Sequence, residues 1–304
     1  MFNTSKKITI GSRKSSLARR QVEIFKNFFF QKYKNLKKDL FKEIYLTTQG
    51  DQILDKKLSE VGNKGLFTKE IDQAQLEHKI DISIHSLKDL PYKLPKGLFI
   101  CAYLKREDYR DAIVSRSNLS LSKLNKGSVI GTSSIRREIQ LKKVRPDLKI
   151  KIIRGNVETR IKKVLDGEYD ATLLAMAGLN RLDIKKNIRP LSSKEFIPAP
   201  GQGIIAIVVR EDDKEIIKPL NEISDKQTDI QAICERSFMY GLDGSCQTPL
   251  GALALLLDKK RVNFSFFASN SNGSILKTGK KIILIENAKK ECFELGKKIR
   301  EMLY

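Results

Sequence analysis

Short apolar runs alternate with amphipathic stretches along most of the chain. Runs rich in Val, Ile, Leu and Ala are typical of buried strands, and apolar side chains three or four residues apart predict helices. This alternation predicts an α/β protein, with helices packed on the faces of sheets. The predicted strands are residues 7–11, 44–48, 81–85, 99–104, 112–115, 128–131, 149–153, 171–175 and 204–209, and the predicted helices are residues 16–33, 68–78, 135–144 and 157–165.

The pattern changes in the last part of the chain. A helix predicted over residues 229–242 is followed by strands predicted over 252–257, 262–268 and, more weakly, 282–285. The chain ends in an amphipathic helix, with Cys292, Ile299 and Leu303 on one side. This order of elements predicts a small α+β domain.

The composition is that of a globular protein with two or three domains, since the chain has 304 residues and 40% of them are hydrophobic. The N-terminal residues lack the apolar core of a signal peptide, and the apolar runs are too short to cross a membrane. We therefore expect a cytoplasmic protein with no membrane association.

The formal net charge of +22 raises the alternative of nucleic-acid binding. However, 41 of the 58 basic residues are lysines spread over the whole chain, which is typical of a solvated surface. A nucleic-acid groove needs basic side chains interleaved with exposed aromatic ones, and the sequence has no tryptophan and no such stripe. We predict no nucleic-acid partner.

The arginines are more informative, because several lie beside glycine and serine where a predicted strand meets a helix. The guanidinium fork binds carboxylates in a bidentate way, and open α/β sheets bind ligands at the carboxyl ends of their strands. Residues 10–15 and 130–134 also resemble each other weakly, and each would offer N–H and hydroxyl groups at a helix N-terminus. Taken singly, each arginine is better explained as exposed surface. Together, Arg13, Arg136 with Arg137, and Arg154 with Arg160 predict a ligand with several carboxylates.

Two further segments carry candidate chemistry. Lys88 and Asp89 follow the strand predicted over residues 81–85, where a carboxylate either stabilises a cation or caps the turn before Pro91. Cys246 lies in a polar loop, whereas the other three cysteines lie in apolar patterns typical of inert core thiols. The chain has no CxxC pair and no histidine at metal-ligand spacing, so we expect neither a metal site nor disulfides.

Eight motifs follow one another in the order found in a known family. They are GSR at 11–13, GLF at 65–67, HSLKDLP at 85–91, REDYRDA at 106–112, GTSSIRR at 131–137, RGNV at 154–157, PGQG at 200–203 and GSCQ at 244–247. Together they resemble the porphobilinogen deaminase family, also called hydroxymethylbilane synthase, from Ile8 to the C-terminal helix.

The resemblance implies a fold and a reaction. The fold has two α/β lobes like those of periplasmic binding proteins and a small C-terminal α+β domain. Domain 1 would comprise residues 1–104 and 200–222, domain 2 residues 105–199, and domain 3 residues 223–304. The family enzyme is a monomeric transferase of porphyrin and heme biosynthesis. It condenses four porphobilinogen molecules head to tail with loss of ammonia, and water releases the linear tetrapyrrole hydroxymethylbilane.

The resemblance also implies roles for single residues. Cys246 matches the cysteine that holds a dipyrromethane cofactor through a thioether, and Asp89 matches the catalytic aspartate. Lys64 and Phe67 match a lid over the cleft. The positions that match binding sites for acetate and propionate side chains are Arg13, Ser15, Lys88, Thr132, Ser134, Arg136, Arg137, Arg154, Arg160 and Arg181, with Arg236 as a further match.

Two positions depart from the family pattern. Asn63 stands where the family commonly has glycine, which puts the dynamics of the lid in doubt rather than the chemistry, and Ser245 stands where glycine is frequent. A two-lobed anion receptor is the remaining alternative, because it would share the fold. The missing signal peptide and Cys246 favour the enzyme.

Overall fold

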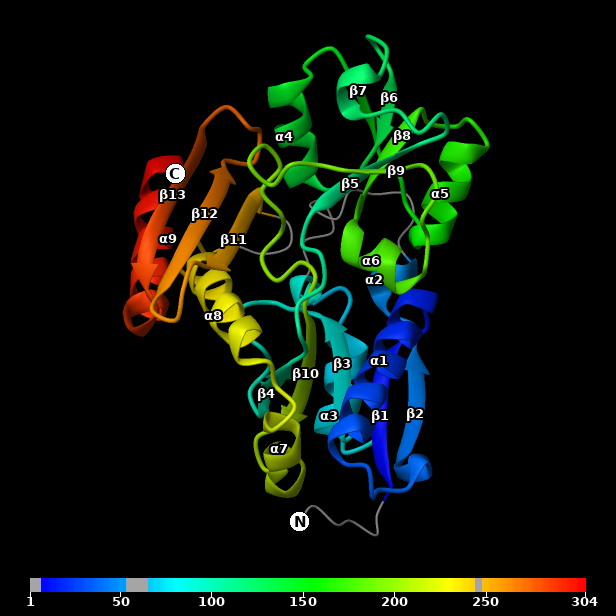
Figure 1. Ribbon diagram of the computed structural model, residues 1–304, viewed down its shortest axis with the longest axis vertical. Helices are drawn as coiled ribbons and strands as arrows, with labels where there is room; N and C mark the ends of the chain where they lie inside the picture. Colours follow the sequence, from blue (N-terminus) through cyan, green and yellow to red (C-terminus); the bar gives the residue numbers. More distant parts are fainter. Residues whose placement is uncertain (1–6, 53–64, 244–247) are drawn as a thin grey trace. The chain divides into compact units, whose positions relative to one another are not determined.

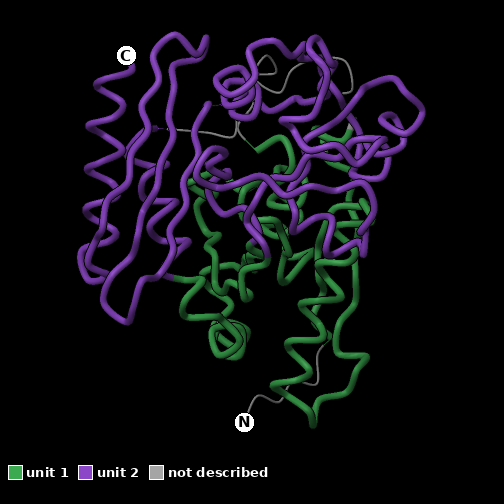
Figure 2. Tube along the Cα trace, turned by 45° about the horizontal axis from the view of Figure 1, so that its top comes forward, with its two compact units in different colours: residues 1–53, 63–107, 204–229 green, residues 54–62, 108–203, 230–304 purple. Residues whose placement is uncertain are grey.

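The computed structural model describes residues 7–52, 65–243 and 248–304. The contacts within the chain divide the described residues into two compact units (Figure 2). Unit 1 comprises residues 7–52, 65–107 and 204–229, and unit 2 comprises residues 108–203, 230–243 and 248–304. The finer division into three domains stays a prediction.

Unit 1 is built on a five-stranded sheet with the order β2-β1-β3-β10-β4 (Figure 1). The strands β1 (Ile8–Arg13), β2 (Phe41–Leu46) and β3 (Ile82–Ser86) run parallel to one another. The strand β10 (Ile205–Arg210) is antiparallel to β3 and to β4 (Leu98–Tyr103). The strand predicted at 204–209 is therefore confirmed, and it pairs with strands from the first third of the chain.

Helices cover both faces of this sheet. On one face, α1 (Ser16–Lys32) and α7 (Lys214–Asn221) pack on the apolar side chains of the strands in a shared core. On the other face, α3 (Lys69–Leu76) is fixed by Gln75, which accepts a hydrogen bond from Ser83 at 2.7 Å and donates to the Val208 carbonyl at 2.9 Å. Successive side chains of a strand point to opposite faces of the sheet. Ile82 and Ile84 of β3 therefore face the core shared with α1 and α7, and Ser83 faces α3.

Unit 2 repeats the sheet pattern with the order β7-β6-β8-β5-β9. As in unit 1, three parallel strands are followed by an antiparallel one, since β6 is parallel to β7 and β8 while β5 is antiparallel to β8 and β9. The strands are β5 (Asp111–Ser115), β6 (Val129–Gly131), β7 (Lys149–Lys151), β8 (Ala171–Ala175) and β9 (Ile188–Pro190), and the helices are α4 (Ile135–Val144), α5 (Val157–Leu165) and α6 (Met176–Arg181).

The rest of unit 2 contains an antiparallel sheet of β11 (Leu250–Leu256), β12 (Arg261–Ser269) and β13 (Leu276–Leu284). This sheet packs against α9 (Ala288–Leu303) and against α8 (Lys226–Gly241), which begins in unit 1. Phe238 of α8 contacts Phe264 and Phe266 of β12, with both pairs of ring centroids 5.4 Å apart. A Cβ atom at Gly296 would lie 2.4 Å from the Phe238 carbonyl oxygen, so α8 and α9 approach closely there.

The predicted fold class is confirmed: the described residues form an α/β protein with two five-stranded sheets and a small α+β part. The bounds of α4 and α5 match their predictions, whereas β2 begins three residues earlier than expected and β13 is far longer. The short elements α2 (Gln49–Gln52), α6, α7 and β9 were not predicted. No described helix combines the length and apolar character needed to span a membrane.

Candidate active site

In unit 1, the predicted site residues lie at the carboxyl ends of two neighbouring strands. Arg13 is the last residue of β1, and Ser15 caps α1 by accepting a hydrogen bond from the Ala18 amide at 3.3 Å. Lys88 and Asp89 lie in a short 3-10 helix (Leu87–Asp89) directly after β3. Because β1 and β3 are parallel, these residues share one edge of the sheet.

Arg13 is the centre of this group. Its Nη1 atom lies 3.9 Å from a carboxylate oxygen of Asp89, and its guanidinium stacks over the ring of Phe67, 4.4 Å from the centroid. The Nε and Nη2 atoms on its other edge both donate to Asp51, a residue without a predicted role. The side chains of Arg13 and Asp89 are 24% and 30% exposed, so a ligand has access to both.

His85 lies beneath this edge as a buried core residue. The register of β1 and β3 pairs Gly11 with Ser83, and its continuation places His85 beside Arg13. Burial and the nearby charge of Arg13 lower the pKa of His85 to about 4. The imidazole is therefore neutral near pH 7. Within the described residues its Nε2 atom has no hydrogen-bond partner.

In unit 2, Thr132 and Ser134 shape the turn between β6 and α4. Ser134 caps α4 and accepts a hydrogen bond from the Arg137 amide at 3.4 Å, while the Ser134 amide donates to the Thr132 hydroxyl at 3.2 Å. The hydroxyl groups therefore hold a helix N-terminus in place, where backbone N–H groups favour anions. Arg136 and Arg137 are in the first turn of the same helix.

Arg136 and Arg137 are buried around one carboxylate, Asp111 at the start of β5. Arg136 donates to Asp111 at 2.7 Å and to the Ile197 carbonyl at 2.8 Å. Arg137 donates from two nitrogens to Asp111, at 3.1 and 2.7 Å, and to the Leu173 carbonyl at 2.7 Å. Despite its burial, the two guanidinium groups hold the pKa of Asp111 far below its ordinary range. Two positive charges facing one negative charge leave a surplus of one positive charge.

The other predicted arginines of unit 2 lie on separate elements. Arg154 follows β7 and is buried, and Arg160 lies in α5, where its Nε atom donates to the Gly155 carbonyl at 2.8 Å. Arg181 ends α6 and donates to the Gly203 carbonyl at 2.6 Å. Arg236 is half-buried in α8. The binding roles of these four side chains stay predictions.

Three acidic residues with contacts at or near the candidate site residues were not found from the sequence. Asp51 and Asp111 hold the arginines, and Glu235 joins α8 to its surroundings by accepting hydrogen bonds from the amides of Gly201 at 2.7 Å and Ala254 at 2.8 Å. The sequence shows Asp111 as an acidic residue next to an apolar strand, but Arg136 and Arg137, which contact it, come from a distant part of the chain. Cys246 and Lys64 lie outside the described residues.

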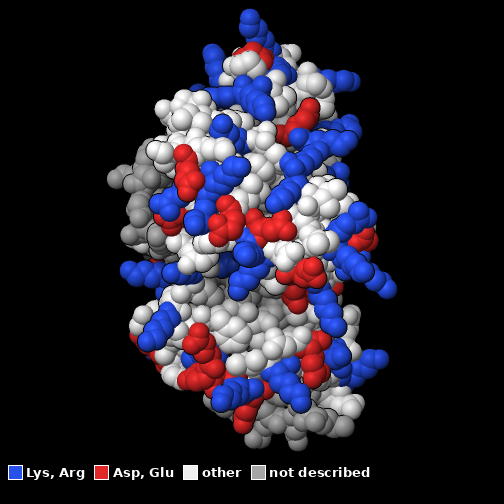
Figure 3. Space-filling model, turned by 90° about the vertical axis from the view of Figure 1, so that its left-hand side faces the viewer, with Lys and Arg blue, Asp and Glu red and all other residues white. Residues whose placement is uncertain are grey.

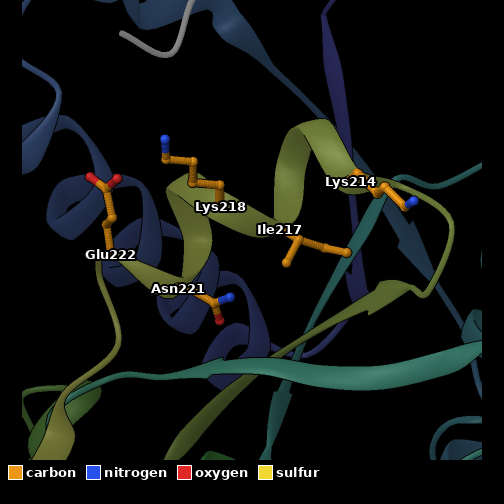
Figure 4. A pocket seen from close by; sticks show the side chains of 5 residues that line it. All are labelled: Lys214, Ile217, Lys218, Asn221 and Glu222. Carbon is orange, nitrogen blue, oxygen red and sulfur yellow. The ribbon is translucent and has the colours of Figure 1, made fainter.

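Two other surface features do not form the site. On the face shown in Figure 3, Lys and Arg side chains are spread among Asp and Glu side chains and do not gather into one patch. In unit 1, a hollow of about 480 Å³ is lined by Lys214, Ile217, Lys218, Asn221 and Glu222 of α7 and its end (Figure 4). The two lysine amines point apart and do not converge on one anion.

Known proteins match almost the whole chain. Residues 8–218 match the family model "Porphobilinogen deaminase, dipyromethane cofactor binding domain", and residues 230–304 match "Porphobilinogen deaminase, C-terminal domain". Porphobilinogen deaminase of Bacillus pumilus (strain SAFR-032) is 43% identical over 269 residues, which cover 88% of this chain and 85% of the relative. The Bacillus subtilis (strain 168) protein of that name is 41% identical over 272 residues, with the same coverage.

The solved structures that align with this chain are much more distant in sequence. An ABC transporter from Parabacteroides distasonis aligns with a TM-score of 0.43 at 10% identity, over 79% of this chain and 76% of its own. The periplasmic aliphatic sulphonate binding protein SsuA from Escherichia coli aligns with a TM-score of 0.40 at 10% identity, over 78% and 75%. The assignment rests on the sequence matches, which confirm the resemblance found in the motifs and the transferase that it implied. The chain belongs to the porphobilinogen deaminase family.

Proposed function

We propose that this chain condenses four porphobilinogen molecules into hydroxymethylbilane with Asp89 as its catalytic carboxylate and a dipyrromethane attached through Cys246. Membership of an enzyme family sets the anion receptor aside. Asp89 lies 3.9 Å from Arg13 at the carboxyl ends of β1 and β3, where open α/β sheets bind ligands, and this placement supports the assignment of Asp89. We further propose that the enzyme acts as a cytoplasmic monomer without nucleic acid.

The chemistry of the substrate explains why a carboxylate belongs there. When porphobilinogen loses ammonia from its aminomethyl group, positive charge develops on the remaining pyrrole unit. The leaving ammonia is neutral because the aminomethyl group departs in its protonated form, so the positive charge moves from the ammonium nitrogen to the pyrrole unit. A fixed negative charge near the pyrrole unit lowers the barrier, because it interacts more strongly with the charge there than with the charge on the ground-state ammonium. Asp89 is 30% exposed and held by the backbone of the 3-10 helix after β3, so it meets this need.

The residues of unit 2 fit a cofactor that carries carboxylates. When bound, dipyrromethane serves as the primer to which substrate units are added. The buried surplus of positive charge around Asp111 favours an anionic partner, because an unbalanced charge inside a protein is costly. Arg136, Arg137 and Arg154 would hold carboxylates there by charge-assisted hydrogen bonds, and the capped N-terminus of α4 adds N–H groups.

Intact mass and ammonia release test the proposal together. Wild-type protein should exceed its sequence mass by a two-pyrrole adduct, and Cys246→Ser should lack that adduct. Asp89→Asn should keep the adduct but lose about 100- to 1,000-fold in kcat, a typical cost of removing one electrostatic stabiliser. The exposed Asp39, paired with Lys7 at 3.4 Å, provides the control Asp39→Asn, which should behave like wild type. Wild-type ammonia release by Asp89→Asn would refute the role of Asp89, and an adduct on Cys246→Ser would refute the attachment.

A further inference from the structure

Arg13 approaches Asp89 without forming a direct hydrogen bond to it. The Nη1 atom stays 3.9 Å from the carboxylate, beyond hydrogen-bond range. The opposite edge of the guanidinium, formed by Nε and Nη2, lies side-on against Asp51, with Nε 3.4 Å from a carboxylate oxygen. Asp51 therefore holds the edge that makes the strongest bidentate contact with a carboxylate.

Asp51 is itself held by hydrogen bonds from Thr48. Its carboxylate accepts hydrogen bonds from the Thr48 amide at 3.1 Å and the Thr48 hydroxyl at 2.8 Å. Although burial opposes ionisation, hydrogen bonds from Arg13 and Thr48 keep the pKa of Asp51 below its ordinary value. The Gly50 amide donates to the Leu66 carbonyl at 2.7 Å, so the turn that carries Asp51 is tied to the segment that carries Phe67.

The charges of the three side chains explain why the contact between Asp51 and Arg13 matters. Arg13, Asp51 and Asp89 together carry one net negative charge, which suits a site that must face a positive substrate group. Without the Asp51 carboxylate, Asp89 is the remaining acidic neighbour that the Arg13 guanidinium meets in unit 1 of the described structure. A guanidinium drawn into direct contact would neutralise Asp89 and compete with the substrate.

We propose that Asp51 is a positioning residue of the active site, which holds the Nε–Nη2 edge of Arg13 and so prevents direct pairing of that guanidinium with Asp89. The inference rests on the proposed function, because it matters only if Asp89 acts on positive charge in the substrate. It adds a residue that neither the motifs nor the family match singled out.

The first test is structural and independent of activity. Crystal structures of the loaded wild type and of Asp51→Asn would be compared, with Asp51→Ala as a second variant because asparagine still offers one acceptor. In both variants, the shortest distance between Arg13 and Asp89 should fall from 3.9 Å to about 2.8 Å, the length of a charge-assisted hydrogen bond. An unchanged distance in Asp51→Ala would overturn the proposal.

The second test is a double-mutant cycle with Arg13→Gln. Asp51→Asn should lower kcat about 10- to 100-fold, because small misplacements near the reacting groups have costs of that order. In Asp51→Asn combined with Arg13→Gln, no guanidinium can pair with Asp89, so the loss should be clearly smaller than the product of the two single losses. A loss equal to that product would show that Asp51 does not act through Arg13, and would overturn the proposal.

Controls separate this inference from the proposed function. Intact mass should show the adduct on every variant, and Asp39→Asn should keep the wild-type kcat. If the wild type carries no adduct or releases no ammonia, the proposed function fails. If the wild type is active and Asp51→Asn matches it, only the role of Asp51 fails.

Discussion

Unit 1 and unit 2 each bring arginine and aspartate together at the ends of strands, but in opposite proportions. In unit 1, one guanidinium lies between two carboxylates, and all three side chains are about a quarter exposed. In unit 2, one carboxylate lies between two guanidinium groups, and the cluster is almost completely buried. The first cluster has a surplus of negative charge and the second a surplus of positive charge.

The difference shows that the neighbours of an arginine decide what it can bind. The sequence grouped Arg13 with Arg136 and Arg137 as binders of carboxylates. In the structure Arg13 lies beside two acids, so its cluster carries a surplus of negative charge, and its role as a binder of carboxylates stays a prediction. Around Asp111 the surplus is positive and shielded from water, so an anion gains more there, because charges interact more strongly in a medium of low dielectric constant.

The largest effect is expected at the centre of the unit 2 cluster. Asp111→Asn keeps the shape of the side chain but removes the only negative charge that faces Arg136 and Arg137 in the described part of the chain. Breaking a buried ion pair by removing one partner costs about 3–5 kcal/mol, because the other charge stays buried. Urea unfolding should show this loss. Asp147→Asn, which removes a surface partner of Arg145, is the matched control and should change little.

The low pKa of Asp111 also determines how its contribution to stability changes with pH. The pKa of Asp111 is lower in the folded protein than the ordinary value of about 3.9. Its contribution to stability is therefore complete above that value and is lost as the pH falls below it toward the folded pKa. Wild-type protein should therefore lose this stability as the pH falls from about 4 toward the folded pKa, and Asp111→Asn should show a flatter profile over that range. Parallel profiles for the two proteins would contradict this account.

Much of the fold followed from the sequence, because burial leaves a periodic signal. Buried β8 and β10 consist of apolar runs, and the predicted α4 and α5 have the observed bounds. β13 was mostly missed, because an edge strand with exposed lysines shows no apolar alternation. The helix α7 contains Pro219 and spans only eight residues, so its signal was too short to read.

The site was only partly predictable, for a different physical reason. The motifs around Asp89 and Arg136 are local, so the sequence marked them. The partners that set their charge balance are far apart in the chain: Arg13 meets Asp51, 38 residues away, and Arg136 meets Asp111, 25 residues away. No fixed spacing along the sequence marks either contact, because the fold brings residues of separate elements together. The sequence therefore identified the arginines but not the acids that hold them.

Asp72 is a buried carboxylate with no cation beside it in the described part of the chain, so it can be compared with Asp111. Asp72 of α3 is 5% exposed, and burial raises its pKa to about 6. Because this folded pKa is above the unfolded value of about 3.9, stability is lost as the pH rises from about 4 to 6. Asp72→Asn should therefore stabilise the protein by roughly 2 kcal/mol at pH 8, and the gain should disappear at pH 4.

Thermal unfolding of the wild type and of Asp72→Asn at pH 8 and pH 4 checks the prediction for Asp72. Asp111→Asn and Asp72→Asn make the same chemical change at buried sites, so opposite signs at pH 8 would separate the effect of neighbouring charge from that of burial. If Asp72→Asn destabilised the protein equally at both pH values, the carboxylate would be a needed hydrogen-bond partner rather than a cost.

The smallest effect is expected at Phe67, which contacts the face of Arg13 but carries no charge. Its ring lies 4.4 Å from the guanidinium, and a cation–π contact at such a part-exposed position contributes about 0.5–1 kcal/mol. Phe67→Leu should therefore raise KM for porphobilinogen roughly 2- to 5-fold, which corresponds to this energy, and leave kcat nearly unchanged because Asp51 still fixes the edge of Arg13.

A matched cation–π pair in the same unit tests whether the effect of Phe67 comes from the site. Arg19 stacks over Tyr45 at 4.0 Å, and neither residue was assigned to the site. Tyr45→Leu removes a contact of the same kind and should leave KM unchanged. Equal KM changes in the two variants would mean that they report a general loosening of unit 1. A large fall in kcat for Phe67→Leu would mean that stacking, and not the Asp51 carboxylate, keeps Arg13 away from Asp89.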